Sequence, residues 1–354
     1  MDVEELLVGP RGRRLCLQWV YWLAEEQAQE GFGSLESDIK RAAGPFEEPV
    51  TTTFPLSARV SPRPGSGTLP TPVDIARRIM QLQVREPTHR EALTLLADTA
   101  SFAMYWQAPW GEDALAATDP VRASLRPIAE ALVAAAAAQW WDGPADLCSQ
   151  WSVQESRSAE PGAGAEPPAE NAAEILRASE ELVGQWWSTP PHRLSHSTRY
   201  LDGLGPVGMW VEEDGTDPQY QVATRIDPPT TPRVLEISGP EDWTRLCREF
   251  PLDVTMSRDG VWPAATGCAG PWTLPDWSAV AESGIDAVHL TVRGYLTTAG
   301  RALPVSGTHS AVLGGWDPDT TWWLTDVGTT GESTLWKMDR PGADGPDLGF
   351  HTVD

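Results

Sequence analysis

Two short stretches near the end of the chain hold most of the residue types that could do chemistry. The first, DAVHLTVRGYLTTAGRALPV, starts at Asp286 and gathers a histidine, an arginine and a tyrosine within a few positions. If it is a strand as far as Tyr295, side-chain alternation puts four polar residues on one face, His289, Thr291, Arg293 and Tyr295. Such a face is costly to bury unless it lines a polar site. The alternative is that it faces solvent on a sheet covered on one side only.

The second stretch, GGWDPDTTWWLTDV, places tryptophans on both sides of an Asp-Pro-Asp turn. Alternation sends Trp322 and its neighbour to opposite faces, so the sheet is covered on both sides or one indole forms a groove floor. Trp316 adds a third aromatic plane, and Asp317 and Asp319 add carboxylates. Aromatic planes with a carboxylate suit a planar or cationic ligand, such as a nucleobase, a nicotinamide, a sugar or an alkylammonium. The alternative is a Trp-rich core, because Asp and Pro form turns for backbone reasons alone.

Several signatures of known chemistries are absent from the sequence. The chain has no GxxxxGK[ST] loop, no GxGxxG after a strand, no GxSxG and no HExxH. Its six histidines are dispersed, and its four cysteines form no CxxC pair. We therefore expect no metal site and interpret the cysteines as free, mostly buried thiols.

The first half of the chain is predicted to be helical. The stretch RGRRLCLQWVYWLAEEQAQ has the apolar spacing of an amphipathic helix. A second helix starts with Thr71 as its cap and Pro72 at its first position, where a missing N–H costs nothing. In a third, Thr88 and Glu91 have the spacing of a capping box. A further long pattern, DPVRASLRPIAEALVAAAAAQWW, is expected to be one helix kinked at Pro127.

From Tyr200 onward the pattern changes to short strands. Apolar and β-branched runs such as PVGMWVEE, YQVATRI, RVLEI, DAVHLTV and STLWKM alternate with Gly, Pro and Asp. Two short helices interrupt them, in PEDWTRLCREFPLDV and PDWSAVAESGIDAV, and each starts with acidic residues. We expect Trp243 and Trp277 to pin these helices to the sheet.

The organisation that follows is α+β. A mainly helical domain over residues 1–154 precedes a mixed or antiparallel sheet domain over 172–354, with short helices and a C-terminal β-meander. Between them, ESRSAEPGAGAEPPAEN (155–171) has no apolar periodicity and is predicted to be a disordered linker. The phrase QWW occurs at Gln139 and again at Gln185, either as a duplication or as two segments docked on one surface.

The charge balance narrows the class of partner. With 26 Lys and Arg against 50 Asp and Glu, the formal net charge is −24. Such a field repels nucleic-acid phosphates and anionic membranes, and it suits a basic protein partner or simple solubility. No stretch has the length of a membrane span, and the first residues lack the pattern of an export signal. We therefore expect a cytoplasmic protein.

From Arg233 to Leu324 the order of residues resembles an ADP-ribosyltransferase catalytic core. Such cores place an Arg or His on an early strand, a Tyr or Ser/Thr on a middle strand and an acidic residue at a late one. The matching positions here are Arg233, Tyr295 with His289, and Asp319, where the family usually has Glu. The Ala, Arg and Pro bias also resembles that of actinobacterial proteins.

The resemblance implies a transferase that uses NAD and acts on a small-molecule or protein acceptor. Asp319 would stabilise the oxocarbenium-like ribose as the glycosidic bond breaks. His289 or Tyr295 would position the cofactor and Arg233 would hold its pyrophosphate. The nicotinamide would lie at Trp316 and Trp322. The other hypothesis is a non-enzymatic binding or scaffold protein that uses Trp-rich surfaces.

Overall fold

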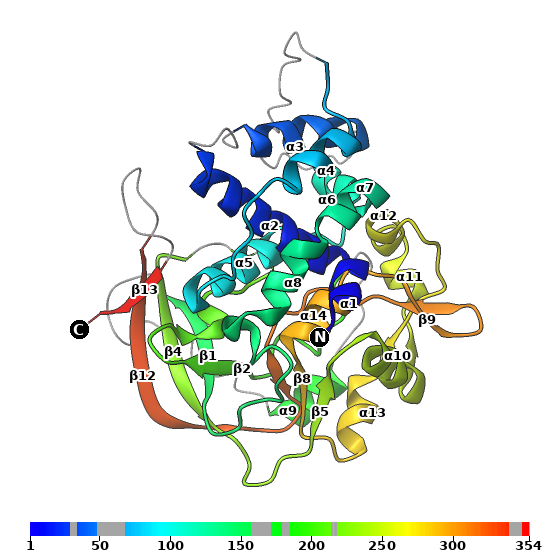
Figure 1. The fold of residues 1–354 in the computed structure, drawn as a ribbon. Coiled ribbons are helices and arrows are strands. Elements are labelled where there is room, and N and C mark those ends of the chain that lie inside the picture. Colours follow the sequence, from blue (N-terminus) through cyan, green and yellow to red (C-terminus); the bar gives the residue numbers. More distant parts are fainter. Residues whose placement is uncertain are drawn as a thin grey trace.

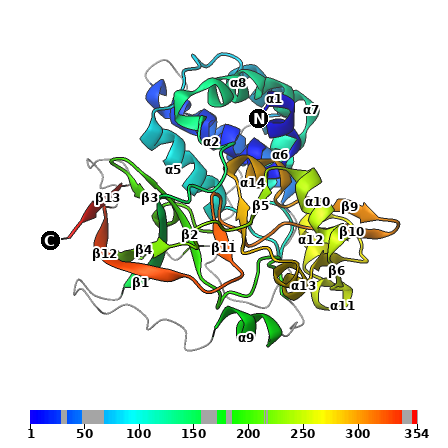
Figure 2. The same ribbon diagram turned by 90° about the horizontal axis from the view of Figure 1, so that it is seen from below.

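The computed structural model describes residues 1–28, 34–47, 68–156, 171–178, 185–213, 215, 218–339 and 349–353. Helices from the first part of the chain gather into one body above a twisted sheet (Figures 1 and 2). Shorter helices from the second part lie beyond one edge of that sheet. The predicted α+β class is confirmed.

The N-terminal helices begin and end largely where local capping rules place them. The side chains of Thr71 and Thr88 each accept a hydrogen bond from the backbone N–H three residues on. In turn, the carboxylates of Asp74 and Glu91 accept from the backbone N–H of these threonines. Both predicted helix starts are therefore confirmed. The helices of this body are α1 (Val3–Val8), α2 (Pro10–Glu26), α3 (Leu35–Ala43), α4 (Pro72–Ile79), α5 (His89–Ser101), α6 (Gly111–Ala117), α7 (Asp119–Ser124) and α8 (Arg126–Ala134).

The long helix predicted around Pro127 is not a single element. It is split at Leu125 into α7 and α8, and Pro127 lies in the first turn of α8. A proline ring cannot extend a helix from the preceding turn, whereas at a helix start its missing N–H is harmless. The second piece ends at Ala134, so the first QWW segment follows as loop and not as helix.

The described strands form one large mixed sheet and two small antiparallel pairs. In the large sheet the order is β13-β12-β4-β1-β2-β11-β8-β5, with β3 paired to β2. Only β5 and β8 among these described neighbours run parallel. The strands are β1 (Gln150–Ser156), β2 (His196–Leu201), β3 (Gly205–Pro206), β4 (Tyr220–Asp227), β5 (Val234–Ile237), β8 (Ala287–Leu290), β11 (Thr321–Trp323), β12 (Gly328–Asp339) and β13 (Gly349–Thr352), with β6 (Pro251–Asp253), β7 (Thr273–Pro275), β9 (Leu303–Ser306) and β10 (His309–Ala311) in the small pairs.

The second part of the chain contains six described α-helices, two of which were predicted from the paired Asp-Trp pattern. They are α9 (Ala172–Arg177), α10 (Pro240–Glu249), α11 (Thr255–Arg258), α12 (Trp262–Thr266), α13 (Trp277–Glu282) and α14 (Val292–Thr298). Trp243 on α10 and Trp277 on α13 are both buried, and Asp276 caps α13 through the N–H of Ala279. The predicted burial of these two indoles is confirmed.

The order of the last strands differs from the predicted meander. After β11 the chain crosses the sheet, and β12 pairs with β4 instead of with β11. Residues 206–213, predicted as a strand, hold only the end of β3 and a 3-10 turn. Strand order depends on contacts between distant segments, which the run of apolar residues along the chain does not encode.

The boundary region at 155–171 is described only at its ends. Glu155 and Ser156 belong to β1 and pair with β4, and Asn171 caps α9. Residues 157–170 of the predicted linker lie outside the described residues. The helices before this region and the strands after it share one hydrophobic core, in which Leu15 of α2 and Tyr295 of α14 both take part.

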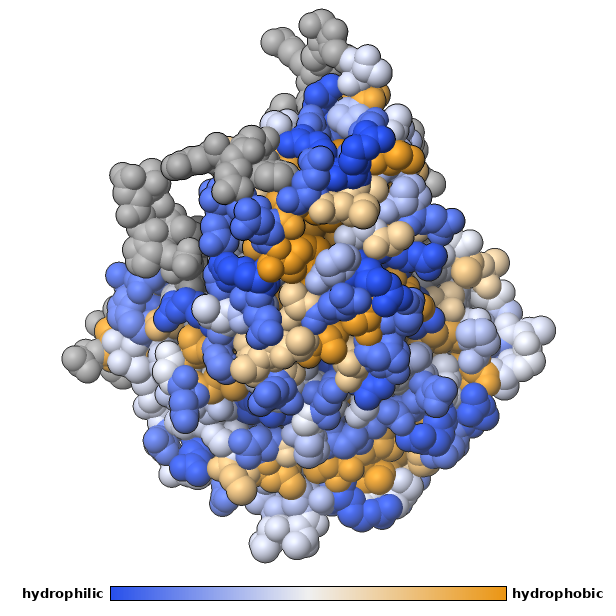
Figure 3. Space-filling view, in the orientation of Figure 1, coloured by the Kyte–Doolittle hydropathy of each residue, from blue (hydrophilic) through white to orange (hydrophobic). Residues whose placement is uncertain are grey.

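The described surface is mainly hydrophilic on the face seen in Figure 3, with apolar side chains in separate groups. Its exposed large apolar residues are few for a chain of this length, among them Met80 and Met256. No described helix combines the length and the apolar character needed to cross a membrane.

Candidate functional site

Strand pairing places His289 on β8, next to the edge strand β5 of the large sheet. His289 on β8 lies opposite Glu236 of the parallel strand β5 and opposite Thr321 of the antiparallel strand β11. Because side chains alternate between the two faces of a sheet, these three project from one face. Trp322, the next residue on β11, projects from the other.

The predicted strand through Tyr295 is wrong beyond Leu290. Thr291 accepts a hydrogen bond from the N–H of Gly294 and caps α14, so the chain turns into a helix. A Cβ on Gly294 would lie 2.1 Å from the carbonyl oxygen of Ile237, so only glycine lets α14 pass so close to the end of β5. Thr291, Arg293 and Tyr295 therefore do not share a strand face with His289.

Asp319 lies within reach of His289, but inside a closed network. The Nε2 atom of His289 is 3.4 Å from Oδ1 of Asp319, and its Nδ1 atom is 2.5 Å from Oε2 of Glu236. The Nε of Arg199 donates to Oδ1 of Asp319 at 2.6 Å, and the backbone N–H of Arg199 donates to Oδ2 at 3.0 Å. Both carboxylate oxygens of Asp319 thus have donors. We call these four residues the His289 network.

The His289 network is balanced in charge and almost closed to water. His289 and Asp319 are each 1% exposed. Burial by itself would lower the pKa of His289, but hydrogen bonds and charges from Asp319 and Glu236 outweigh it and raise that pKa. His289 and Arg199 thus face two carboxylates, which favours the protonated form of the imidazole. This arrangement links strands β2, β5 and β8 to the turn before β11, and both oxygens of the buried carboxylate of Asp319 are already engaged.

The first QWW segment covers this network. The guanidinium of Arg199 lies 5.0 Å from the ring of Trp140 and donates to the carbonyl of Pro144. The N–H of Ala145 donates to Glu236. Burial of the network thus depends on the loop that follows the first QWW pair.

The remaining residues predicted for the site lie elsewhere. Tyr295 is buried beside Glu213, and burial together with that carboxylate raises its pKa well above the ordinary value. Arg233 is exposed before the first residue of β5, where its backbone N–H donates to the carboxylate of Asp286 and its guanidinium donates to the carbonyl of Ser283. It does not reach Asp319.

The two indoles predicted to bind a cofactor are part of the packed core. Trp316 is 0% exposed and donates to Ser188, and Trp322 is 5% exposed with its ring 4.6 Å from that of His196. Their ring centroids are 6.5 Å apart, on the face of the sheet away from His289. The sheet is therefore covered on both sides here, and Asp319 and Trp322 do not share one concave surface.

Acidic residues concentrate around the first aspartate of the turn. Oδ1 of Asp317 accepts the backbone N–H of Glu213 at 2.7 Å, and Glu213 accepts from the N–H of Gly315 and the hydroxyl of Tyr105. Burial raises the pKa of Glu213 to about 7. Burial also raises the pKa of Asp317 well above the ordinary value, and the charges of Glu213 and Glu212 add to this effect.

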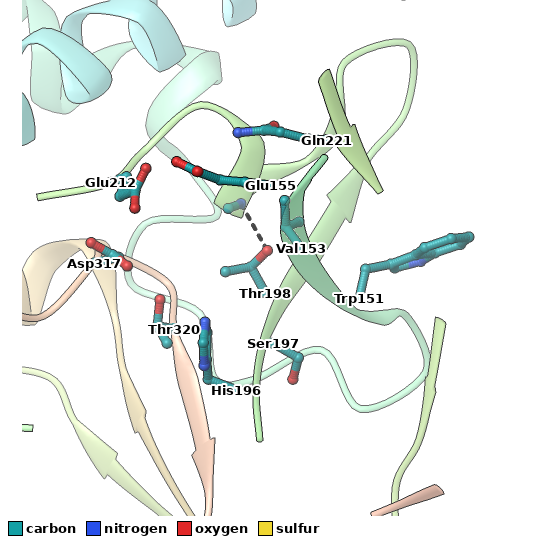
Figure 4. A pocket seen from close by; sticks show the side chains of 11 residues that line it. Trp151, Val153, Glu155, His196, Ser197, Thr198, Glu212, Gln221, Asp317 and Thr320 are labelled. Carbon is teal, nitrogen blue, oxygen red and sulfur yellow. Dashed lines mark hydrogen bonds between the residues drawn. The ribbon is translucent and has the colours of Figure 1, made fainter. Parts of the chain in front are cut away.

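Asp317 lines a small cavity of about 70 Å³ that we call the Asp317 pocket. Figure 4 shows the carboxylates of Glu155, Glu212 and Asp317 arranged around one space, with His196 and Thr320 beside them. Glu155 comes from β1, and both it and Glu212 are exposed, so they form the mouth. The lining consists of Trp151, Val153, Glu155, His196, Ser197, Thr198, Gly208, Glu212, Gln221, Asp317 and Thr320.

The lining of the Asp317 pocket is rich in hydrogen-bond acceptors. It contains three carboxylates and no lysine or arginine. Burial lowers the pKa of His196, so this imidazole does not supply a positive charge near neutral pH. The side-chain oxygen of buried Gln221 has no donor among the described residues. The lining of the Asp317 pocket therefore combines three carboxylates with no lysine or arginine of its own.

A metal is not what the described geometry fits. Among the described residues no group of three or more His, Cys, Asp or Glu side chains is arranged to hold a metal ion. The acidic groups of the Asp317 pocket surround a space without converging on one point at ligand distance.

Several of these residues were not identified from the sequence. Arg199 and Glu236 are single charged residues inside strands, where a charged side chain needs a partner, and this signal was present in HSTRYL and RVLEI. Glu155 and Glu212 carry no such signal, because they meet Asp317 only once β1 and the segment after β3 are in place.

No protein-family model matches the chain, and no curated protein and no solved structure resembles it.

Proposed function

We propose that this chain is a binding protein for a primary ammonium group, which enters the Asp317 pocket. The observation that carries the proposal is the set of three carboxylates on a lining that contains neither lysine nor arginine. Negative charges held together in a partly desolvated space repel one another, and a bound cation removes that repulsion. An ammonium group also supplies three N–H donors to a lining rich in acceptors.

The size and position of the pocket favour a compact cation on a longer chain. A space of about 70 Å³ accommodates an ammonium head and little more. Glu155 and Glu212 at the mouth leave a way out for an alkyl chain. The ammonium group belongs either to a free alkylamine or to a lysine side chain of a basic protein. The net charge of −24 attracts both from a distance.

Binding should be linked to the protonation of Asp317. Burial raises the pKa of this carboxyl, so Asp317 in the pocket keeps its proton to a higher pH than an exposed aspartate does. A cation stabilises the ionised form and lowers the pKa, and binding therefore releases a proton. Because protons compete with the ammonium group, affinity should increase as the pH rises through the pKa of Asp317.

The proposal is tested by calorimetric titration with n-butylammonium at pH 8. The neutral isostere n-butanol separates charge from alkyl contact, and tetramethylammonium separates charge from N–H donation. We expect n-butylammonium alone to bind with a 1:1 stoichiometry. Asp317→Asn should weaken it by about tenfold or more, the usual effect of losing a hydrogen bond between charged groups.

The control variant is Asp202→Asn, which makes the same charge change at an exposed acid outside the pocket lining. If both variants lowered affinity equally, the effect would come from net charge and not from the pocket. Equal binding of n-butanol or of tetramethylammonium would also defeat the proposal. A lysine-containing peptide, compared with its acetyl-lysine form, tells a protein partner from a free amine.

The transferase hypothesis stays a prediction, and NAD is included in the same titrations. It requires the nicotinamide to stack on Trp316 or Trp322 beside Asp319. Those indoles are buried, and Asp319 is occupied by Arg199 and His289. The described geometry therefore favours binding at the Asp317 pocket over transfer chemistry at Asp319. Saturable quenching of Trp fluorescence by NAD, lost in Asp319→Asn, would reverse that preference.

A further inference from the structure

A second, larger cavity lies between α9 and the small sheet formed by β6 and β7. Its volume is about 540 Å³, within the range of small-molecule sites. We call it the Trp277 cavity. It is lined by Ile175, Leu176, Arg177 and Ala178 of α9 and its end; by Gln185, Trp187, Thr189, Pro191, His192 and Arg193; and by Leu252, Arg258, Leu274, Pro275, Asp276, Trp277 and Ser278.

The Trp277 cavity has the opposite charge to the rest of the chain. Its lining holds three arginines, Arg177, Arg193 and Arg258, and one acid, Asp276. That acid is engaged as the cap of α13. The chain as a whole has about twice as many acidic as basic residues, so a cationic lining is a local exception. A cavity with this balance attracts anions and repels the cations that suit the Asp317 pocket.

One of these arginines is held rigidly from behind. Arg258 is 2% exposed, and its guanidinium donates to Gln185, to the carbonyl of Trp187 and to Ser257. It also lies 5.4 Å from the ring of Trp262. A guanidinium fixed in this way loses little conformational entropy when it binds an anion. Little of the binding free energy is therefore spent on ordering this side chain.

Two buried polar groups on the same lining lack partners among the described residues. They are the indole N–H of Trp277 and the hydroxyl of Thr189, on side chains 8% and 6% exposed. A buried donor without an acceptor costs free energy, and such a group in a native structure calls for an explanation. A ligand with oxygen acceptors would supply one.

Most of the remaining lining is apolar or aromatic. Leu176, Leu274 and Pro275 are buried, and the lining includes the indoles of Trp187 and Trp277. Burial lowers the pKa of His192, so this ring is neutral near pH 7 and adds aromatic surface. Aromatic side chains favour flat, apolar ligands through area and ring contact.

We propose that the Trp277 cavity binds an aromatic carboxylic acid as its anion. The carboxylate lies toward the arginine side of the lining and accepts hydrogen bonds from Trp277 and Thr189. The ring packs between the indoles and the leucines. This site is separate from the Asp317 pocket, since the two linings share no residue.

The test uses 2-naphthoate as the probe and isothermal calorimetry as the readout. The neutral 2-naphthamide and the cationic 2-naphthylmethylammonium have the same ring and a different head group. We expect 2-naphthoate to bind with a 1:1 stoichiometry, at least tenfold more tightly than either analogue. Equal or tighter binding of the amide or the cation would overturn the proposal, as would no binding of 2-naphthoate up to 10 mM.

The variant Thr189→Val removes the unpartnered hydroxyl and keeps the shape of the side chain. It should raise the melting temperature of the free protein and weaken 2-naphthoate binding by about tenfold. Thr298→Val is the matched control, because Thr298 is also buried with an unpartnered hydroxyl but lies on α14 outside the cavity. It should raise the melting temperature and leave binding unchanged.

A second variant, Trp277→Phe, keeps an aromatic ring and removes the N–H. It should also weaken 2-naphthoate binding, and Asp317→Asn should not. If 2-naphthoate bound equally well to wild type, Thr189→Val and Trp277→Phe, the site would not be the Trp277 cavity. A loss of binding in Asp317→Asn as well would show that both probes use the Asp317 pocket.

Discussion

Glu213 should make the stability of this protein fall as the pH rises from about 5 to 8. Its carboxyl is 8% exposed, and burial raises its pKa from 4.5 to about 7. Between these values the folded chain keeps a proton that the unfolded chain has released. Stability contributed by the protonated group is therefore present at low pH and lost as the pH rises through the raised pKa.

The size of the effect follows from the shift. Each pKa unit corresponds to about 1.36 kcal/mol, so the rise in the pKa of Glu213 to about 7 amounts to roughly 3 kcal/mol of unfolding free energy. Glu213→Gln keeps the shape of the protonated carboxyl and cannot ionise. The variant should match wild type near pH 5 and exceed its unfolding free energy by roughly 3 kcal/mol at pH 8.

The assay is urea denaturation, monitored by Trp fluorescence. The 18 tryptophans of the chain give this fluorescence a high intensity. Other ionising groups affect wild type and variant alike, so the quantity of interest is the difference between the two proteins at each pH. Glu86→Gln, an exposed glutamate, is the control and should show no such difference. A gap between wild type and Glu213→Gln that is the same at pH 5 and pH 8 would refute the reasoning.

Three further predictions concern the packing of the sheet. Asp319→Asn should lower the unfolding free energy by about 3–5 kcal/mol, because it removes the carboxylate that faces Arg199 and His289. Asn suits the φ of 65° at this turn, so the backbone itself should not suffer. Unchanged urea midpoints would show that Asp319 is only a turn former. Trp243→Ala and Trp277→Ala should each cost roughly 3–5 kcal/mol, and wild-type melting temperatures for both would contradict the packing described. His289→Gln should lower the unfolding free energy most at low pH, where the protonated imidazole stabilises the fold. The loss should become smaller as the pH rises through the raised pKa of His289. A loss that does not vary with pH would mean that this imidazole is neutral.

Local chemistry along the chain was enough to predict the features that depend on few neighbours. The capping box of Thr88 and Glu91 and the buried faces of α10 and α13 involve residues within one or two helical turns. The contact between His289 and Asp319 likewise depends on few elements, because β8 and β11 are neighbours and β11 starts just after the turn.

Features that depend on strand order could not be predicted in the same way. Arg199 reaches Asp319 because β2 pairs with β11, and Glu236 reaches His289 because β5 runs parallel to β8. The local sequence of these strands does not determine either pairing. The carboxylates of the Asp317 pocket likewise come from segments far apart in the sequence, so the concentration of charge there is a property of the fold.

The misreading of Thr291 has a different cause. A β-branched residue in an apolar run favours a strand, and the same hydroxyl can cap a helix. The helix forms because Gly294 fits against the carbonyl of Ile237, a contact between two elements that the local sequence does not reveal.

The measurement that tests the central claim most directly is a crystal structure of the protein soaked with n-butylammonium at pH 8. We expect the nitrogen atom inside the Asp317 pocket, within hydrogen-bond distance of the Asp317 carboxylate and near Glu155 or Glu212. The Asp317→Asn protein, soaked in the same way, should show no such nitrogen. An n-butylammonium ion bound only elsewhere, or an empty Asp317 pocket in wild-type crystals at a saturating concentration, would contradict the account.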